Sequence, residues 1–503
     1  MTQSYCRMLH NLTAEGSGWL AAPFLDPLAG GGYAWHEHTL LSLVEGRVVL
    51  AATHPLPTEA TAFRERLEAP FIEVLIPGFV NAHTHLELSL TDGLMPRGAS
   101  FAAWARELTA FKMQHGTEAL RAGTMRGLEL AAQAGTTALA DVASQPAAVP
   151  PLADAPMRVA VCAEALAISP AQARERHALM HAILEAARGL DPKPGAEVRR
   201  RISPHAPHTV CDELADMLRG ELWQAGEVDP PVVHLAEMPA ERALLERGTG
   251  EFRELFDGFG LLGPEWQPPG AGPVALAEAR GWLRPPGGAA RTPHHDEGFL
   301  ARVRRSGTPS PARALLIHAN DLQPHEAACL MDAPVAICWC PQTHAWFGHR
   351  PWPLELMASA GLPVVLGTDS LASAWSLSPL ENLRQALRSA PQWPAAEALA
   401  AATLRARDAV LGRVAGHPPA ADLTLLRMPG EAARRFIRRR QYEAPAALRE
   451  LLLDPEVTPV ARVVGGRVQA CLAGEEERFR PLDHRTPPPH TPPPAEVFGP
   501  ESV

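Results

Sequence analysis

The chain has 503 residues and a net charge of −10, and 20% of its residues are charged. This balance argues against nucleic-acid binding by bulk electrostatics, and the length allows a large core in one or more domains. No apolar stretch reaches the roughly 18 residues of a membrane span, and the N-terminus lacks the basic and apolar regions of a signal peptide. The seven cysteines are dispersed, as in a reducing compartment. We therefore expect a cytoplasmic protein with no nucleic-acid or membrane partner.

Strand-like segments mark both ends of the chain. Each is short and apolar, and the last is typical of a hairpin around Gly465 and Gly466. The segments are 40–44, 46–52, 421–426 and 460–470.

Helices and strands alternate through the middle of the chain. Apolar residues recur three and four positions apart in some segments, as in helices, and form short runs in others, as in strands. The expected helices are 101–111, 118–133 and 379–387, and the expected strands include 136–141 and 157–162. Such alternation predicts a parallel sheet.

An apolar run over residues 71–80 predicts a buried strand that leads into His83 and His85. Side chains two residues apart on a strand point to the same side, so the two imidazoles can converge on one ion. A second pair with this spacing, His36 and His38, has no such run before it. We therefore expect His83 and His85 to belong to a metal site.

Three later strand-like runs also end in a side chain that can bind a metal. These side chains are His234, His318 and Asp369. A single histidine of this kind is about as often a hydrogen-bonded core residue as a ligand. Several strand-like runs that each end in such a side chain indicate a metal site more strongly than any one of them does. Polar chemistry at the C-terminal ends of successive parallel strands is the functional layout of a β/α barrel.

Two segments depart from this alternation. Residues 284–312, rich in Pro, Gly and Arg, predict an insertion in the form of a surface loop or a lid. Within it, His294 and His295 follow no strand, so we do not expect them to bind metal. Residues 476–503 form a Pro-rich tail that we expect to be extended or disordered.

Several motifs, in one order along the chain, resemble the amidohydrolase superfamily. They are Pro77–His85, His234–Glu237, His318, Cys340–His344 and Gly367–Ser373. The nearest branch contains the cytosine, guanine, S-adenosylhomocysteine and aminodeoxyfutalosine deaminases together with the triazine hydrolases. The resemblance implies an α/β fold: a metal-dependent (β/α)8 TIM barrel over residues 76–412, and a small β-sandwich built from residues 1–75 and 413–475.

The resemblance also implies the ligands of the metal, which are His83, His85, His234 and Asp369. Superfamily members with two metals bridge them through a carboxylated lysine on the fourth strand. This chain has only two lysines, Lys112 and Lys193, and neither ends a predicted strand. We therefore expect one divalent ion. Zinc fits this nitrogen-rich set, and ferrous iron is the alternative.

By the same resemblance, three residues carry the reaction. Glu237 shuttles a proton to a ring nitrogen of an aromatic heterocycle, and Asp369 takes a proton from the attacking water. His318 polarises that water, with a role as a further metal ligand as the alternative. The expected substrate contacts are His205, Glu87 and Ser370.

The motifs around Glu87 and Ser373 resemble aminodeoxyfutalosine deaminases more than guanine or cytosine deaminases. We therefore expect hydrolytic deamination of an adenine-type nucleoside or a related aminated heterocycle, with aminodeoxyfutalosine, in menaquinone synthesis, as the specific candidate. The alternatives are a triazine-type chlorohydrolase or aminohydrolase, a guanine or cytosine deaminase and, in another class, a non-catalytic barrel that binds a ligand. The expected partner is a small heterocyclic molecule, and the resemblance is compatible with a homodimer.

Overall fold

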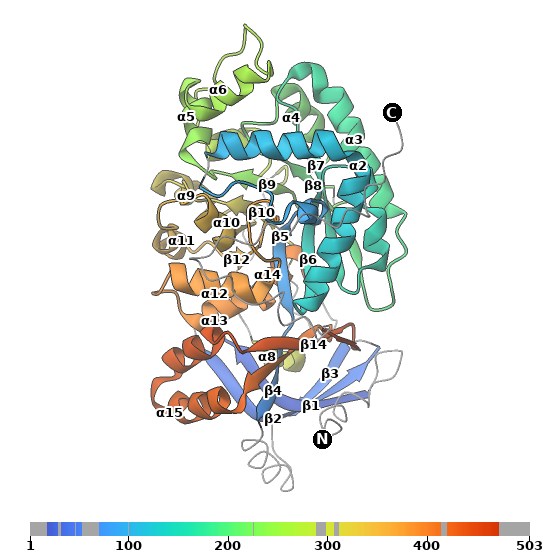
Figure 1. The fold of residues 1–503 in the computed structure, drawn as a ribbon, viewed down its shortest axis with the longest axis vertical. Coiled ribbons are helices and arrows are strands. Elements are labelled where there is room, and N and C mark those ends of the chain that lie inside the picture. The colour runs from blue at the N-terminus through green and yellow to red at the C-terminus, as the bar shows by residue number, and fades with distance from the viewer. Residues whose placement is uncertain are drawn as a thin grey trace.

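The computed structural model describes residues 18–28, 32–45, 47–52, 70–98, 100–224, 226–287, 298–305, 311–413 and 420–471. The expected tail 476–503 and the pair His294 and His295 lie outside these residues. The described chain forms a barrel of parallel strands wrapped by helices, with a separate sheet at one end of the barrel (Figure 1). No described helix is both long and apolar enough to cross a membrane.

The barrel consists of two four-stranded parallel halves, β5 to β8 and β9 to β12. A parallel bridge between Thr84 and Asp369 joins the halves beside β5 and β12, and one between Arg201 and Asp229 joins them beside β8 and β9. The strands are β5 (Phe79–Thr84), β6 (Thr136–Ala143), β7 (Arg158–Ala165), β8 (Val198–Pro204), β9 (Val232–Leu235), β10 (Ala314–His318), β11 (Val335–Trp339) and β12 (Val364–Leu366). The expected α/β barrel is confirmed.

Helices connect the strands and cover the outside of the barrel (Figure 1). Strands such as β5 and β6 are buried along their whole length, as expected for a parallel sheet covered by helices. The helices are α2 (Phe101–Gln133), α3 (Ala173–Arg188), α4 (Asp212–Leu218), α5 (Pro239–Arg247), α6 (Glu251–Gly258), α7 (Pro273–Ala279), α9 (Pro324–Leu330), α10 (Pro341–Trp346), α11 (Leu354–Ser359), α12 (Pro379–Ser389), α13 (Ala395–Ala401) and α14 (Leu404–Leu411).

Helix α2 contains the two helices expected at 101–111 and 118–133, joined at a kink. At Gly116 φ is 65° and ψ is −165°, and a positive φ of this kind favours glycine. The first half of α2 crosses the barrel at the end opposite the terminal sheet (Figure 1), where Trp104 Nε1 donates to the carbonyl of Ala372 over 2.7 Å. The second half approaches the backbone at Glu87 so closely that a Cβ on Gly123 would lie 2.1 Å from the Glu87 carbonyl oxygen.

Strands from both ends of the chain form one seven-stranded sheet, as the resemblance implied. Its order is β15-β14-β13-β4-β1-β2-β3, and the two ends of the chain meet where β4 and β13 pair antiparallel. The strands are β1 (Gly18–Pro27), β2 (Tyr33–Val44), β3 (Arg47–Ala52), β4 (Phe71–Pro77), β13 (Leu423–Pro429), β14 (Thr458–Val464) and β15 (Arg467–Ala470), and helix α15 (Gly430–Leu453) follows β13. His36 lies in β2 of this sheet, outside the barrel.

The run at 71–80, expected to be one strand, is divided at Gly78 between two sheets. Strand β4 belongs to the terminal sheet, and β5 belongs to the barrel. A Cβ on Gly78 would lie 2.3 Å from Thr137 Oγ1, so the chain passes too close to β6 at this point for a larger residue. Both strands are apolar because both are buried, so hydropathy does not reveal the division.

Residues 298–305 of the 284–312 insertion pack on the terminal sheet. Helix α8 (Phe299–Arg305) begins where the carboxylate of Asp26 accepts hydrogen bonds from the backbone N–H groups of Phe299, at 2.6 Å, and Leu300, at 3.0 Å. Phe299 also stacks on Phe24, with ring centroids 5.6 Å apart. The expectation of a surface loop or lid is wrong for this part, because its apolar side chains complete the core under the terminal sheet.

A buried ion pair ties the barrel to the terminal sheet and provides a test of their coupling. Arg158 on β7 binds the carboxylate of Asp422 with Nε at 2.8 Å and Nη2 at 3.2 Å, and Gly465 N donates to the same carboxylate at 2.9 Å. Arg158 also pairs with Glu197, and Asp422 also pairs with Arg407. We expect Asp422→Asn to lower the free energy of unfolding by about 3 kcal/mol, the low end of the range for breaking a buried ion pair, because Arg158 keeps Glu197 as a partner. Urea unfolding measures the change. The control Glu431→Gln, which removes an exposed pair on α15, should cost less than about 1 kcal/mol.

Candidate active site

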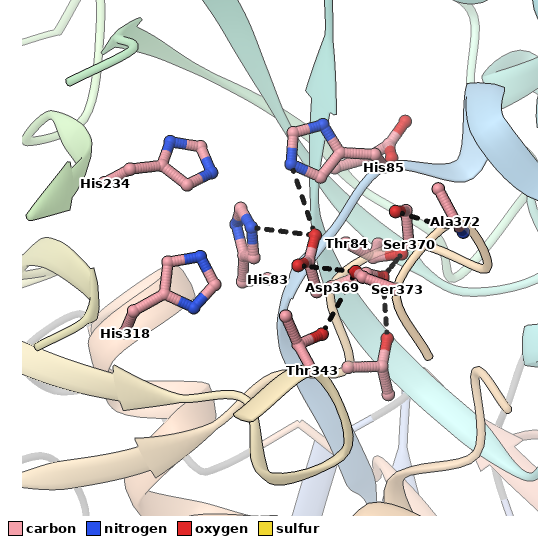
Figure 2. A network of polar contacts seen from close by, with 12 residues as sticks. His83, Thr84, His85, His234, His318, Thr343, Asp369, Ser370, Ala372 and Ser373 are labelled. Carbon is pink, nitrogen blue, oxygen red and sulfur yellow. Dashed lines mark hydrogen bonds and ion pairs between the residues drawn. The ribbon is translucent and has the colours of Figure 1, made fainter. Parts of the chain in front are cut away.

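The C-terminal ends of the barrel strands bring the four predicted metal ligands together. Figure 2 shows the side chains of His83, His85, His234 and Asp369 directed toward a common centre, with His318 beside them. Ligand atoms of His83, His85 and Asp369 lie within 4.8 Å of one another, and so do those of His83, His234 and His318. Both groups share His83, so the five side chains line one site.

The Asp369 carboxylate contacts both histidines of the first pair. Its Oδ1 lies 3.7 Å from His83 Nε2 and 3.6 Å from His85 Nε2, and its Oδ2 accepts a hydrogen bond from Ser373 Oγ at 3.0 Å (Figure 2). The His83 and His85 rings are perpendicular, with centroids 4.9 Å apart. Ser373 thus orients one carboxylate oxygen and leaves the other facing the histidines.

Hydrogen bonds to the chain set the tautomers of two further histidines. His234 Nδ1 lies 3.0 Å from the carbonyl oxygen of His205, which can only accept, so Nδ1 carries the proton and Nε2 is free to bind an ion. The Thr209 hydroxyl donates to the Ala206 carbonyl and lies 2.6 Å from His205 Nδ1, which therefore donates to it. His205 Nε2 is left as an acceptor, and the ring stacks 4.8 Å from that of His234.

The backbone is strained where these strands end. Positive φ values occur at Ala236 (49°), His318 (72°), Ala319 (50°) and Asp369 (61°), and the described part of the chain has just one other non-glycine residue of this kind, Glu45. Such conformations cost of order 1–3 kcal/mol each and gather at functional sites. Here they turn the chain so that side chains after β9, β10 and β12 point into the site.

Burial disfavours the charged form of four histidines at the site. It lowers the pKa of His85 and His234 well below the usual value, and neighbouring imidazoles lower both further. Burial likewise lowers the pKa of His205 and His318 to about 3. A neutral imidazole has a lone pair for a metal, whereas an imidazolium does not.

The two carboxyl groups of the site are shifted in opposite directions. Burial raises the pKa of Glu237 well above its usual value, and Asp369 and Glu241 add to the rise. Burial also opposes ionisation of Asp369, but its contact with His83 and the other imidazoles around it hold its pKa below the usual range. Glu237 is therefore suited to donate a proton and Asp369 to act as an anion, and Glu237 Oε1 lies 3.6 Å from His318 Nε2.

The three predicted substrate-contacting residues differ in how many hydrogen bonds their side chains already make within the protein. His205 faces the site with Nε2 free, as described above. The Ser370 hydroxyl accepts from Ala372 N at 3.3 Å. The Glu87 carboxylate is buried and accepts from Ser144 N at 3.0 Å and from Lys112 Nζ at 3.2 Å. Their direct contact with substrate stays a prediction.

Sequence reasoning missed a charged cluster beside the histidines. Lys112 binds Glu87, and its side chain keeps 32% of its surface exposed. Glu164, at the end of β7, and Glu87 both act on Lys112; burial alone would lower the lysine pKa, but the two carboxylates raise it above its usual value. Asp141, at the end of β6, accepts from Leu86 N at 2.8 Å. Asp141 and Glu164 could have been identified from the sequence, because both lie near the ends of predicted strands.

The donor set fits a single divalent transition ion. Both ring nitrogens of His83 are buried, and neither has a hydrogen-bond partner within the described residues. A buried polar atom without a partner costs about 1–3 kcal/mol, and an ion removes that cost. Neutral imidazoles with one ionised carboxylate are the ligands that zinc prefers.

A family model described as the amidohydrolase family matches residues 74–413, which include all of these site residues. The match covers more than half of the chain, and the chain belongs to the amidohydrolase family.

The chain is also similar to individual members. An aminodeoxyfutalosine deaminase from Deinococcus radiodurans is 34% identical over 221 residues, which are 42% of this chain and 45% of that protein. The crystal structure of Helicobacter pylori aminofutalosine deaminase with methylthio-coformycin superimposes with a TM-score of 0.63 at 17% identity, over 90% of this chain and 99% of that one. An adenosine deaminase from Xanthomonas campestris with bound zinc gives 0.60 at 17% identity, over 90% and 92%. The two structures support the fold.

Removal of one histidine should empty the metal site. We expect the protein to retain one tightly bound divalent ion after gel filtration, and His234→Ala to lose most of it, because a ligand is gone. Elemental analysis of the eluted protein measures the ion. The control His325→Ala removes an exposed histidine on α9 and should keep the metal. Equal metal in both variants would contradict the site.

Glu164 should make stability depend on pH. Burial raises its pKa from 4.5 to about 7, and Glu87 adds to the rise. A carboxyl that ionises later in the folded chain than in the unfolded chain favours unfolding as pH rises from about 4.5 to about 7. We therefore expect Glu164→Gln to be more stable than the natural chain at pH 8 and equal to it at pH 4. Urea unfolding at both pH values tests this, and a constant difference between the two proteins would refute it.

Proposed function

We propose that the protein is a metal-dependent hydrolytic deaminase of an adenine-type nucleoside or a related aminated heterocycle, with aminodeoxyfutalosine as the specific substrate. The observation that carries the proposal is that two carboxyl groups contact one histidine cluster, Glu237 at His318 and Asp369 at His83 and His85, and that their surroundings raise the pKa of Glu237 and lower that of Asp369. Two carboxyl groups with separated pKa values are the arrangement that acid–base catalysis requires. The identity to the Deinococcus aminodeoxyfutalosine deaminase supports the substrate.

His83, His85, His234 and Asp369 would hold the ion, with zinc as the candidate metal. The chemistry supplied by a divalent ion bound there is a pKa of about 7 for a water molecule. Asp369 would accept a proton from the attacking water, and His318, whose Nε2 lies 3.6 Å from Glu237 Oε1, would orient that water by hydrogen bonding. Both residues come from strand ends of the barrel.

Glu237 supplies the proton that activates the ring. It protonates the ring nitrogen next to the amino-bearing carbon, which makes that carbon electrophilic. Water adds to the carbon, and the proton taken by Asp369 passes to the amino group. The carbon–nitrogen bond then breaks and ammonia leaves, while the added hydroxyl group gives its remaining proton to the Glu237 carboxylate, which leaves a ring carbonyl and restores the protonated Glu237. His205, whose Nδ1 donates to Thr209 and whose Nε2 is an acceptor, would accept a hydrogen bond from the substrate.

The test is ammonia release from aminodeoxyfutalosine, adenosine, S-adenosylhomocysteine, guanine, cytosine and an aminotriazine, with chloride release from a chlorotriazine followed in parallel. We expect turnover of an adenine nucleoside, and Glu237→Gln should lower it roughly 10²- to 10⁴-fold while the metal content stays unchanged. The control Glu254→Gln, on the exposed side of α6, should keep full activity. No ammonia release from any of the amines by the metal-loaded protein, or full activity of Glu237→Gln, would overturn the proposal.

A further inference from the structure

A second group of metal-binding side chains lies in the outer helix layer. His177 and His181 are on α3, and Glu221 lies in the turn after α4. Their ligand atoms all lie within 4.8 Å of one another. Of the groups of this kind within the described residues, it is the one that shares no residue with the active site.

The three side chains point at each other from two elements. Residues four apart on a helix share a face, and the two imidazole centroids are 4.6 Å apart. His177 Nε2 lies 3.0 Å from Glu221 Oε1, and His181 Nε2 lies 3.1 Å from Glu221 Oε2. Each carboxylate oxygen therefore faces one ring nitrogen.

The contact between His181 Nε2 and Glu221 Oε2 lacks the geometry of a hydrogen bond. Glu221 Oε2 is buried, and within the described residues it has no partner with the alignment of a hydrogen bond, although His181 Nε2 is 3.1 Å away. Apart from the two imidazoles, the described chain has no cation paired with Glu221, so no arginine competes with an ion for this carboxylate. The side chains of His177, His181 and Glu221 keep 18%, 45% and 25% of their surface exposed, which leaves the group open to solvent.

We propose that His177, His181 and Glu221 form a second metal site, which binds a divalent first-row transition ion such as zinc. Two imidazole nitrogens and one carboxylate oxygen are a donor set that zinc accepts, with solvent as the remaining ligand. The ion joins α3 to the segment after α4. Because it binds the folded chain alone, it stabilises the fold by mass action and takes no part in the reaction.

The test is to count zinc sites on the metal-free, full-length protein by isothermal titration calorimetry. We expect two classes of site in the natural chain. The one lost in the double variant His177→Gln/His181→Gln is the proposed site, and the other is lost in His234→Ala. Glu221→Gln should weaken the proposed site about 100-fold, since even partners outside the ligand shell are worth roughly 10- to 100-fold in affinity. The control His325→Ala should keep both classes.

Thermal unfolding gives a second readout. Zinc beyond one equivalent should raise the Tm of the natural chain and of His325→Ala, and leave that of the double variant unchanged. A single class of site in the natural chain, or a second class that survives in the double variant, would overturn the proposal. The double variant should release ammonia at the natural rate, so a failure of the proposed deaminase activity would not affect this result.

Discussion

Closure of the barrel between β5 and β12 is the constraint on which the active site depends. Asn81 and Thr368, 287 residues apart, bind each other twice: Asn81 Nδ2 donates to Thr368 Oγ1 at 2.7 Å, and Thr368 N donates to Asn81 Oδ1 at 3.0 Å. Next to them, Asp369 N donates to the His83 carbonyl at 3.0 Å, and Thr84 Oγ1 donates to the Asp369 carbonyl at 3.1 Å. These bonds hold β5 and β12, the first and last strands of the barrel, together where Asp369 contacts His83 and His85.

Burial of this seam sets the electrostatics of the site. Removal from water disfavours every charge, so it lowers the pKa of His85 and His234 and raises that of Glu237. Asp369 stays ionised because the histidines around it favour its charge. The result is a set of imidazole lone pairs beside one carboxylate, which is a donor set suited to a divalent ion. The same low polarity strengthens the hydrogen bonds that orient Asp369 and His234.

The sequence showed which strands end in side chains that can bind a metal because these signals are local, and the family resemblance then implied which four of them are ligands. A histidine that follows an apolar run is a strand-end residue wherever the strand lies, and the barrel places all such ends on one face. The errors came from contacts between distant segments. Hydropathy does not separate β4 from β5, because both are buried in different cores. The sequence predicts a loop where helix α8 lies, because the packing partner of this helix, Phe24, is in the first strand and far away in the sequence.

The sequence by itself determined the alternation of strands and helices and the strands that end in possible metal ligands, since periodicity and strand ends are properties of neighbouring residues. Its motifs, through their resemblance to the amidohydrolase superfamily, implied which four side chains are the expected ligands. The tertiary structure alone decided which side chains meet. It brings Lys112 of α2 to Glu87 and Glu164, sets the tautomer of His234 through the backbone of His205, and gathers His177, His181 and Glu221 outside the barrel. The physical reason is that pKa shifts, tautomers and shared ligand positions arise from through-space distances and burial, and only the folded chain defines these.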